Sequence, residues 1–326
     1  GTAVTVRHER KVSLAFGPHF ADRRSRMADS IPVIVNPAAR STQAARRIAA
    51  IEALSPRPRV LITQQPGDAE RLAETLVREG HRLVVAAGGD GTVNEVLQGL
   101  CRANTALTAG QQAALGVLPI GTMNVFSLEL NLPGKDLPGC WLRLVSGHTR
   151  EIDLWTANEH YFIQLAGVGV DAEIIRQTTW EAKKKLGPLS YVLSAVRVMR
   201  GRSPVLTLQV PGEAPRVGSL VLVGNGRHYG GPFRLFEQAD AADGLLDVLV
   251  FHQVGPWELA QLVRRLTTSG YSPSEDFECF QAREFTVTVG DSRGGPTRVP
   301  MELDGELRGE TPVHFKLAER RLTVAV

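Results

Sequence analysis

Short apolar segments alternate with helical patterns between residues 31 and 150, and this alternation is the feature that most constrains the fold. Four compact apolar runs occupy residues 32–35, 60–62, 83–87 and 115–118. Between them, apolar residues recur at spacings of three and four, which is typical of amphipathic helices. This alternation predicts a Rossmann-like α/β domain over residues 31–150, with a parallel sheet covered by helices.

The pattern changes after about residue 151. Strand-like runs now follow one another with Pro- and Gly-rich turns between them, which indicates a mainly antiparallel β-sandwich over residues 151–326. The predicted strands are 161–165, 205–210, 219–223, 245–251 and 285–289. Helical patterns are predicted at 187–200 and 256–269. The last strand, 322–326, fits either domain from sequence alone.

Composition excludes several classes of protein. The chain has 326 residues, 43% of them hydrophobic, which is enough for two domains. Three widely spaced cysteines, Cys101, Cys140 and Cys279, form no disulfide framework or zinc pattern, which indicates a reducing, cytoplasmic compartment. Residues 1–26 carry six basic and two acidic side chains, so the net charge of +3 leaves the rest of the chain close to neutral. Nucleic-acid binding, which needs a concentrated basic surface, is therefore not expected.

Membrane insertion is not expected either. The longest uncharged run, residues 103–128, contains Pro119 together with several glycines, glutamines and asparagines. A lipid-facing helix would not carry that polar load. Residues 1–30 are expected to form an extension, disordered or foreign to the protein, outside both domains.

A glycine-rich loop follows the third apolar run, with the sequence Gly88-Gly89-Asp90-Gly91-Thr92. Glycines let the backbone approach a phosphate closely, and a helix N-terminus after the loop favours an anion. Thr92 is expected to cap that helix. Asp90 would act beside a phosphate as a ligand of magnesium or water, or as a proton acceptor. A plain strand-to-helix turn is the alternative reading.

A second loop, residues 119–124, follows the fourth run and contains Gly121, Thr122 and Asn124. Ligands of open α/β sheets bind at the carboxyl ends of the strands, where Asn36 and Thr63 also fall. Four polar strand ends at one edge predict a nucleotide pocket. Neither loop is a Walker A or a GxGxxG motif.

These residues resemble the diacylglycerol kinase catalytic domain family, whose relatives include bacterial lipid kinases and sphingosine and ceramide kinases. The resemblance covers residues 31–326 and extends to Ile152-Asp153-Leu154, Asn225, Tyr229-Gly230-Gly231, residues 243–248 and residues 303–306. It implies an α/β domain of the NAD-kinase and phosphofructokinase type. It also implies ATP between the two domains and transfer of its γ-phosphate to a lipid hydroxyl with Mg²⁺.

The loops and the resemblance together assign site residues. Residues assigned to ATP binding are Asn36, Thr63, Gly88, Gly89, Asp90, Gly91, Thr92, Val93, Asn94, Glu95, Gly121, Thr122 and Asn124. The resemblance implies a structural magnesium site at Asp243 with the carbonyls of Leu246 and Val248, although Asp-Gly is also a common hairpin turn. It implies that Glu306, with Asp304 and Asp90, carries the catalytic carboxylate chemistry. His228 is expected to be a packed or hydrogen-bonded side chain.

One departure bears on the substrate. Val125 stands where the family often has Asp, so the acceptor is either diacylglycerol or another lipid alcohol. Lys183, Lys184 and Lys185 would either contact lipid headgroups or form a solvated helix face. We expect peripheral contact with a membrane surface, and a homodimer is left open. An NAD kinase and a catalytically silent nucleotide- or lipid-binding regulator are the alternative functions.

Overall fold

The computed structural model describes residues 31–37, 42–134, 136–169, 172, 204–255, 277–290 and 297–326. The extension before residue 31, both helical patterns of the second half and the three consecutive lysines lie outside the described residues. Within the described residues, no helix is long and apolar enough to cross a membrane.

The first domain is built on a six-stranded sheet in the order β2-β1-β3-β4-β20-β5. Its strands are β1 (Pro32–Val35), β2 (Arg59–Ile62), β3 (Leu83–Gly88), β4 (Ala114–Pro119), β5 (Thr149–Ile152) and β20 (Leu322–Ala325). The first four are parallel, whereas β5 runs antiparallel to β20. The parallel arrangement confirms the α/β prediction.

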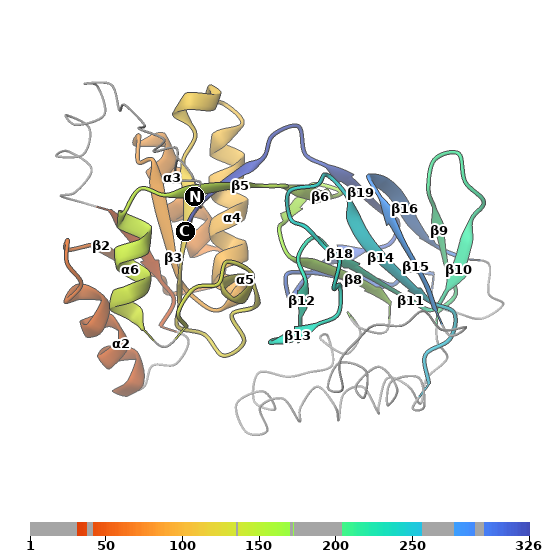
Figure 1. Cartoon of the computed structure of the whole chain (residues 1–326), viewed down its shortest axis with the longest axis horizontal. Helices are drawn as coiled ribbons and strands as arrows, with labels where there is room; N and C mark the ends of the chain where they lie inside the picture. Colours follow the sequence, from red (N-terminus) through yellow and green to blue (C-terminus); the bar gives the residue numbers. More distant parts are fainter. Residues whose placement is uncertain are drawn as a thin grey trace, which may run out of the picture.

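Helices cover both faces of this sheet (Figure 1). They are α2 (Thr42–Glu52), α3 (Asp68–Arg78), α4 (Asp90–Asn104), α5 (Val125–Glu129) and α6 (Leu137–Val145), with a 3-10 turn at Ala109–Gln111. Helices α3 and α4 pack on one another. On the opposite face, the indole of Trp141 in α6 donates to the carbonyl of Pro56, just after α2, at 2.9 Å.

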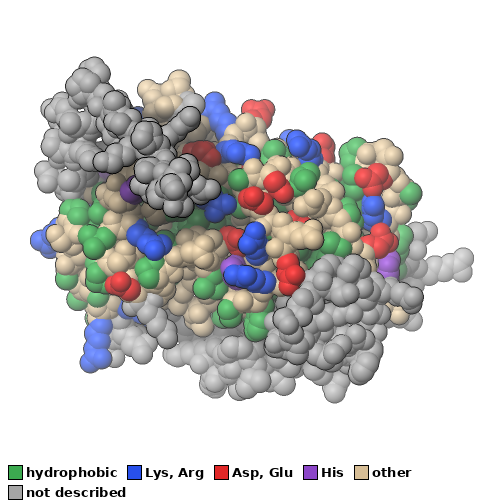
Figure 2. Space-filling view, in the orientation of Figure 1, with side chains coloured by type: hydrophobic (Ala, Val, Ile, Leu, Met, Phe, Trp, Pro, Cys, Tyr) green, Lys and Arg blue, Asp and Glu red, His purple; other side chains and the backbone are tan. Residues whose placement is uncertain are grey.

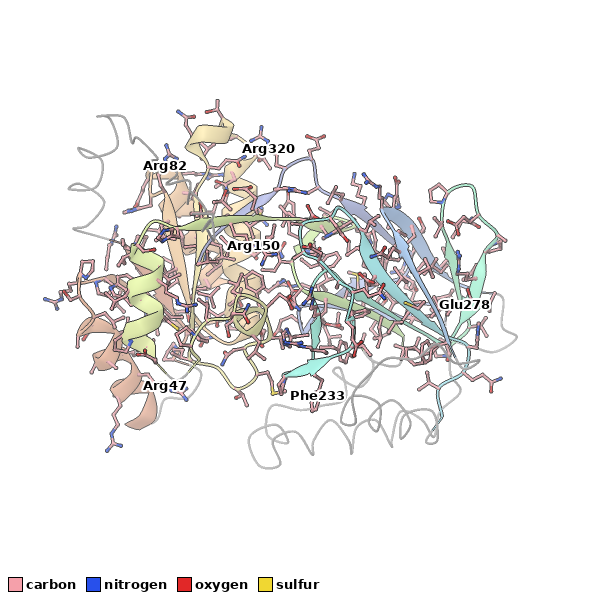
Figure 3. All side chains as sticks on the ribbon, viewed as in Figure 1. Arg47, Arg82, Arg150, Phe233, Glu278 and Arg320 are labelled. Carbon is pink, nitrogen blue, oxygen red and sulfur yellow. The ribbon has the colours of Figure 1, made fainter. Side chains whose placement is uncertain are left out.

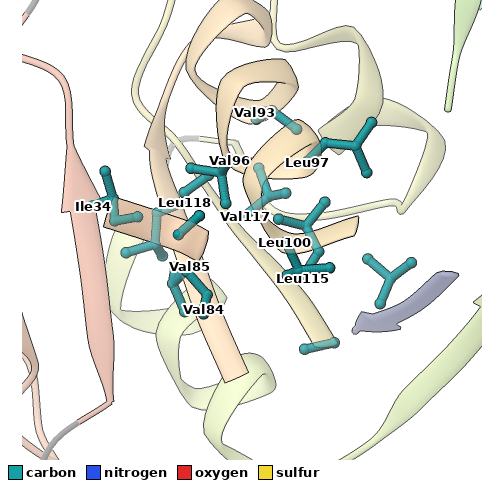
Figure 4. Close-up of a cluster of buried hydrophobic side chains, with 14 of the residues drawn as sticks. Ile34, Val84, Val85, Val93, Val96, Leu97, Leu100, Leu115, Val117 and Leu118 are labelled. Atoms are coloured by element: carbon teal, nitrogen blue, oxygen red, sulfur yellow. The ribbon is translucent and has the colours of Figure 1, made fainter. Parts of the chain in front are cut away.

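The core of this domain lies between the central strands and α4 (Figure 4). Strands β3 and β4 are buried along nearly their whole length, as expected for parallel strands covered on both faces. Val93, Val96, Leu97 and Leu100 of α4 are all buried against them. Each such side chain contributes about 1.5–3 kcal/mol relative to an exposed one, so α4 and the loop before it are held firmly.

The described part of the second domain contains two mainly antiparallel six-stranded sheets, which confirms the predicted sandwich. Their orders are β10-β9-β16-β19-β6-β7 and β15-β14-β11-β8-β17-β18. The strands are β6 (Trp155–Ala157), β7 (His160–Phe162), β8 (Leu165–Gly169), β9 (Leu206–Gln209), β10 (Arg216–Gly218), β11 (Leu220–Gly224), β14 (Leu246–Phe251), β15 (Phe277–Ala282), β16 (Glu284–Val289), β17 (Pro300–Leu303), β18 (Glu306–Glu310) and β19 (Val313–Leu317). Aromatic rings fill the space between the sheets, where Phe285 and Phe315 stack at 4.8 Å.

The domains are joined by more than one crossing of the chain. Strand β5 leads into β6, and β20 returns from the sandwich to pair with β4 and β5 in the first sheet. A separate hairpin, β12 (His228–Tyr229) and β13 (Phe233–Arg234), stands on the side of the second domain that faces α5.

One predicted strand was wrong. Residues 161–165 do not form a single strand, because the chain breaks between β7 and β8. The backbone N–H groups of Ile163, Gln164 and Leu165 all donate to the carboxylate of Asp304. These hydrogen bonds take the place of strand pairing at this point.

Candidate functional site

The carboxyl ends of the first strands meet at one edge of the first sheet. The N–H of Thr63 donates to the carbonyl of Val35 at 3.0 Å, and the N–H of Asn36 donates to that of Ala87 at 3.1 Å. Thr63 is buried, whereas Asn36 is exposed. The polar strand ends that the sequence indicated therefore lie side by side.

The two glycine loops touch through their backbones. The N–H groups of Ile120 and Gly121 donate to the carbonyl of Gly88 at 3.2 and 3.0 Å. A Cβ atom on Gly121 would collide with the Cα of Gly89. The contact therefore requires glycine at position 121, and the two loops form one surface.

The first loop enters α4 without a side-chain cap, so the expected cap at Thr92 was wrong. Gly89 is the N-cap, in an extended conformation, and accepts from the N–H groups of Thr92 and Val93 at 3.0 and 3.1 Å. Thr92 lies one turn further, where its buried side chain covers Gly88 so closely that a Cβ there would collide with it.

Asp90 connects the first loop to α5, the helix that follows the second loop. Its Oδ1 accepts from the N–H of Phe126 at 3.4 Å, in the first turn of α5. Burial raises the pKa of the Asp90 carboxyl, and hydrogen bonds from the α5 amides act in the opposite direction. The second loop is closed on itself by Asn124, which has φ +50° and exchanges two hydrogen bonds of 3.0 Å with the backbone of Gly121. Thr122 is exposed at its tip.

Glu306 reaches the first loop from the second domain. It begins β18, directly after the tight turn of Asp304 and Gly305, both of which have positive φ. A Cβ atom on Gly91 would collide with the Oε1 of Glu306 and lie 3.1 Å from its Cδ. Two residues that are far apart in the sequence are thus in contact, and the absence of a side chain at Gly91 is what admits the carboxylate.

Asp304 is buried and has only 8% of its surface exposed. Its carboxylate accepts from the N–H groups of Ile163, Gln164 and Leu165 at 3.3, 2.9 and 3.1 Å, and from the Nδ2 of Asn94 at 3.1 Å. Burial raises the pKa of Asp304 to about 6, against the effect of these four donors. Asp304 therefore fixes the turn before Glu306 and ties it to α4.

Three residues assigned to ATP binding point inward. Val93 is in the core, and Asn94 is fully buried, bonded to Asp304 and, at 2.9 Å, to the Nη2 of Arg308. Glu95 accepts from the N–H of Ala69 in the first turn of α3 at 3.3 Å. In this structure they hold α4 in place rather than line the loop.

The structural magnesium implied at Asp243, Leu246 and Val248 stays a prediction. The Oδ1 of Asp243 accepts from the N–H of Leu245 at 2.9 Å, across Gly244 with φ +74°, which is the hairpin-turn reading. Leu246 and Val248 lie in β14, where Val248 pairs with Val223 on one side and Phe280 on the other. Among the described residues, no group of three or more His, Cys, Asp or Glu side chains could hold a metal.

A second contact between the domains was not found from the sequence. Glu129, at the end of α5, accepts from the ring Nδ1 of His228 at 2.9 Å and from the N–H of Arg227 at 2.8 Å. The expectation of a hydrogen-bonded His228 is confirmed. No local pattern marks Glu129, because its partners lie about a hundred residues further along the chain.

Comparisons with known families agree with this architecture. The diacylglycerol kinase catalytic domain model matches residues 30–157, and the YegS C-terminal NAD kinase beta sandwich-like domain model matches residues 164–326. The two models thus divide the chain close to the change of architecture from α/β to β-sandwich.

Individual relatives are similar over much of the chain. A protein of Pseudomonas fluorescens named "Probable lipid kinase YegS-like" is 32% identical over 77% of this chain and 80% of its own length. Its namesake in Pseudomonas aeruginosa PAO1 is 35% identical over 59% of this chain, a match that spans only 61% of that relative. A diacylglycerol kinase of Staphylococcus aureus RF122 is 26% identical over 80% of both chains.

Solved structures share the fold. The crystal structure of a diacylglycerol kinase from Bacillus anthracis covers 91% of this chain and 96% of its own, with a TM-score of 0.71 and 24% identity. A second crystal structure from that organism has the same coverage, a TM-score of 0.73 and 25% identity.

Proposed function

This chain belongs to the family of YegS-like lipid kinases with a diacylglycerol kinase catalytic domain, and from that premise we propose that it transfers the γ-phosphate of ATP to the hydroxyl of a lipid such as diacylglycerol or a related lipid alcohol. The observation that carries the proposal is the contact between Glu306 and Gly91. It puts a carboxylate from the second domain against the loop where phosphates would bind.

The nucleotide would bind along the two touching glycine loops. Thr92 and Glu306 cover Gly88 and Gly91, so the nucleotide would approach the loops at Gly89, the N-cap of α4, where the helix N-terminus favours an anion. Asn36, Thr63 and Thr122 would complete the binding edge. The buried Asn94 and the half-buried Glu95 would act by fixing α4.

Asp90 is the carboxylate that fits a magnesium–phosphate complex. It stands in the first loop, and its position beside the α5 amides leaves it at the junction of both loops. Mg²⁺, when bound with ATP, would neutralise charge on the phosphates. To bind the ion, the Asp90 carboxylate would have to give up its hydrogen bond from the N–H of Phe126.

Glu306 would accept the proton of the lipid hydroxyl. A lipid alcohol is a weak nucleophile, and a positioned base contributes typically 10²–10⁴-fold to such a step. Asp304 would position this base, because its four donors fix the turn from which Glu306 projects.

The acceptor would be presented from a membrane surface by peripheral contact at its cytoplasmic side. Phe233, on the β12–β13 hairpin, is 36% exposed and is followed by the exposed Arg234 (Figure 3). An apolar side chain beside a basic one suits an interface with anionic lipid. Figure 2 shows basic and acidic side chains interspersed over the described part of one face.

The test is a phosphorylation assay with purified protein, Mg²⁺ and [γ-³²P]ATP. The acceptors are diacylglycerol, sphingosine, ceramide, a mixed lipid extract and NAD, with mass spectrometry of the product. We expect label in a lipid. Label in NAD alone would favour an NAD kinase, and nucleotide or lipid binding without turnover on any acceptor would favour a silent regulator.

A further inference from the structure

One carboxylate oxygen of Glu129 accepts hydrogen bonds from four donors of the second domain. Its Oε2 accepts from the N–H of Arg227 at 2.8 Å, the N–H of His228 at 3.3 Å, the Nδ1 of His228 at 2.9 Å and the Nε2 of Gln164 at 3.4 Å. The side chains of Glu129 and His228 are only 14% and 13% exposed. Hydrogen bonds to a carboxylate in such surroundings are stronger than neutral ones, and a donor left without its acceptor is costly.

Glu129 belongs to the segment that begins with the second glycine loop. Helix α5 receives Asp90 at its first turn and ends at Glu129. The same segment makes a second contact further back, where the Cε of Met123 would lie 2.7 Å from a Cβ on Gly231. Residues 123–129 therefore touch the hairpin at two points.

The hairpin is the element that these contacts hold. His228 pairs with Arg234 and Tyr229 with Phe233, across a turn in which Gly230 and Gly231 have φ +58° and +127°. Gln164 also holds it, since its Nε2 donates to the carbonyl of His228 at 3.0 Å. The N–H of Gln164 in turn donates to Asp304. The position of the hairpin is thus linked to both the loops and the turn before Glu306.

We propose that Glu129 is a positioning residue that holds the β12–β13 hairpin against the nucleotide loops, so that the lipid acceptor is presented to the phosphate. This role rests on the proposed function. It acts on the acceptor side of the reaction, because the carboxylate contacts the hairpin, whereas the surfaces assigned to ATP lie at the two loops.

The test compares Glu129→Ala and Glu129→Gln with wild type on phosphatidylglycerol vesicles containing dioleoylglycerol. Glu129→Ala is expected to lower kcat/KM for the lipid at least tenfold while KM for ATP stays within twofold. Glu129→Gln keeps one acceptor oxygen and should fall between the two. Glu237→Ala, an exposed carboxylate just beyond the hairpin, is the matched control and should match wild type within twofold.

Hydrogen exchange gives a readout that is independent of turnover. In Glu129→Ala the amides of Arg227 and His228 should exchange at least tenfold faster, with those of β3 unchanged.

Three outcomes would overturn the proposal. They are unchanged exchange at both amides, a lipid kcat/KM within twofold of wild type, and a KM for ATP that rises as much as that for lipid. If Glu129→Ala does not fold, Glu129→Gln decides by the same criteria. Wild type that phosphorylates none of the lipids would instead refute the proposed function, and hydrogen exchange would still decide whether Glu129 holds the hairpin.

Discussion

Two carboxylates in one turn meet different surroundings. Asp304 is buried and accepts four hydrogen bonds from the protein, whereas Glu306, two residues on, lies against the bare backbone of Gly91. Two neighbouring carboxylates in such different surroundings can serve different roles. The residue that fixes the turn is therefore distinct from the residue that would take the proton.

Substitution Glu306→Gln tests the second of these roles. The amide keeps the size of the side chain but cannot accept a proton, so kcat for lipid phosphorylation should fall by about 10²–10⁴-fold. ATP binding, measured by calorimetry, should be nearly unchanged. Glu310→Gln, an exposed position at the end of the same strand, is the control. Near-normal turnover in Glu306→Gln would assign the proton to another group.

Asp304 should make stability depend on pH. Its pKa is raised from 3.8 to about 6 in the folded protein, so the folded state holds a proton that the unfolded chain has already released. Stability should therefore decrease as pH rises from about 4 to about 6 and level off above, by about 3 kcal/mol in all.

Urea unfolding at several pH values checks this, with Asp304→Asn as the reference because its side chain does not titrate. The difference between wild type and variant should change across that pH window. A difference that stays constant from pH 4 to 7 would contradict the raised pKa.

At the scale of elements, the contact between the two glycine loops is the most demanding feature. Gly121→Ala would drive a methyl group into the Cα of Gly89 and push the loops apart. We expect ATP affinity to fall at least tenfold, measured by calorimetry. Gly134→Ala meets nothing within 4 Å and should bind ATP like wild type. Unchanged ATP affinity in Gly121→Ala would show that the loops are not part of the ATP-binding surface.

The loops were predictable because their signal is local. An apolar run that ends in glycines and leads into an amphipathic helix shows the strand, the turn and the helix in one short window, as at residues 83–97. Details within that window were less secure: the backbone geometry of Gly89 displaced the expected cap at Thr92.

Contacts between distant segments were not predictable in the same way. Glu129 with His228, and Asn94 with Asp304, are pairs whose members lie far apart in the chain and carry no spacing that joins them. The resemblance to a family located Glu306, but only the fold brought it to Gly91. Another long-range contact, from the N–H groups of residues 163–165 to Asp304, broke the predicted strand at 161–165.

At the scale of the whole molecule, the first sheet depends on β20, a strand that follows the whole sandwich in the sequence. Val324 of β20 is fully buried and pairs with Leu115 of β4. Val324→Ala should lower the free energy of unfolding by about 2 kcal/mol through lost burial and the cavity left behind. Chemical denaturation measures this, with the half-exposed Val217→Ala expected within about 0.5 kcal/mol of wild type. An equal effect of both would mean that β20 adds little to the sheet.

The position of β20 also has a consequence for biosynthesis. A ribosome makes β1 to β4 well before β20, the strand that fills the gap between β4 and β5, because the strands of the second domain lie between them in the sequence. The apolar edge of β4 that later pairs with β20 therefore stays uncovered while the sandwich is synthesised and folds. Chaperones that shield nascent chains would find their target there, and the first sheet would be completed only after β20 has been made.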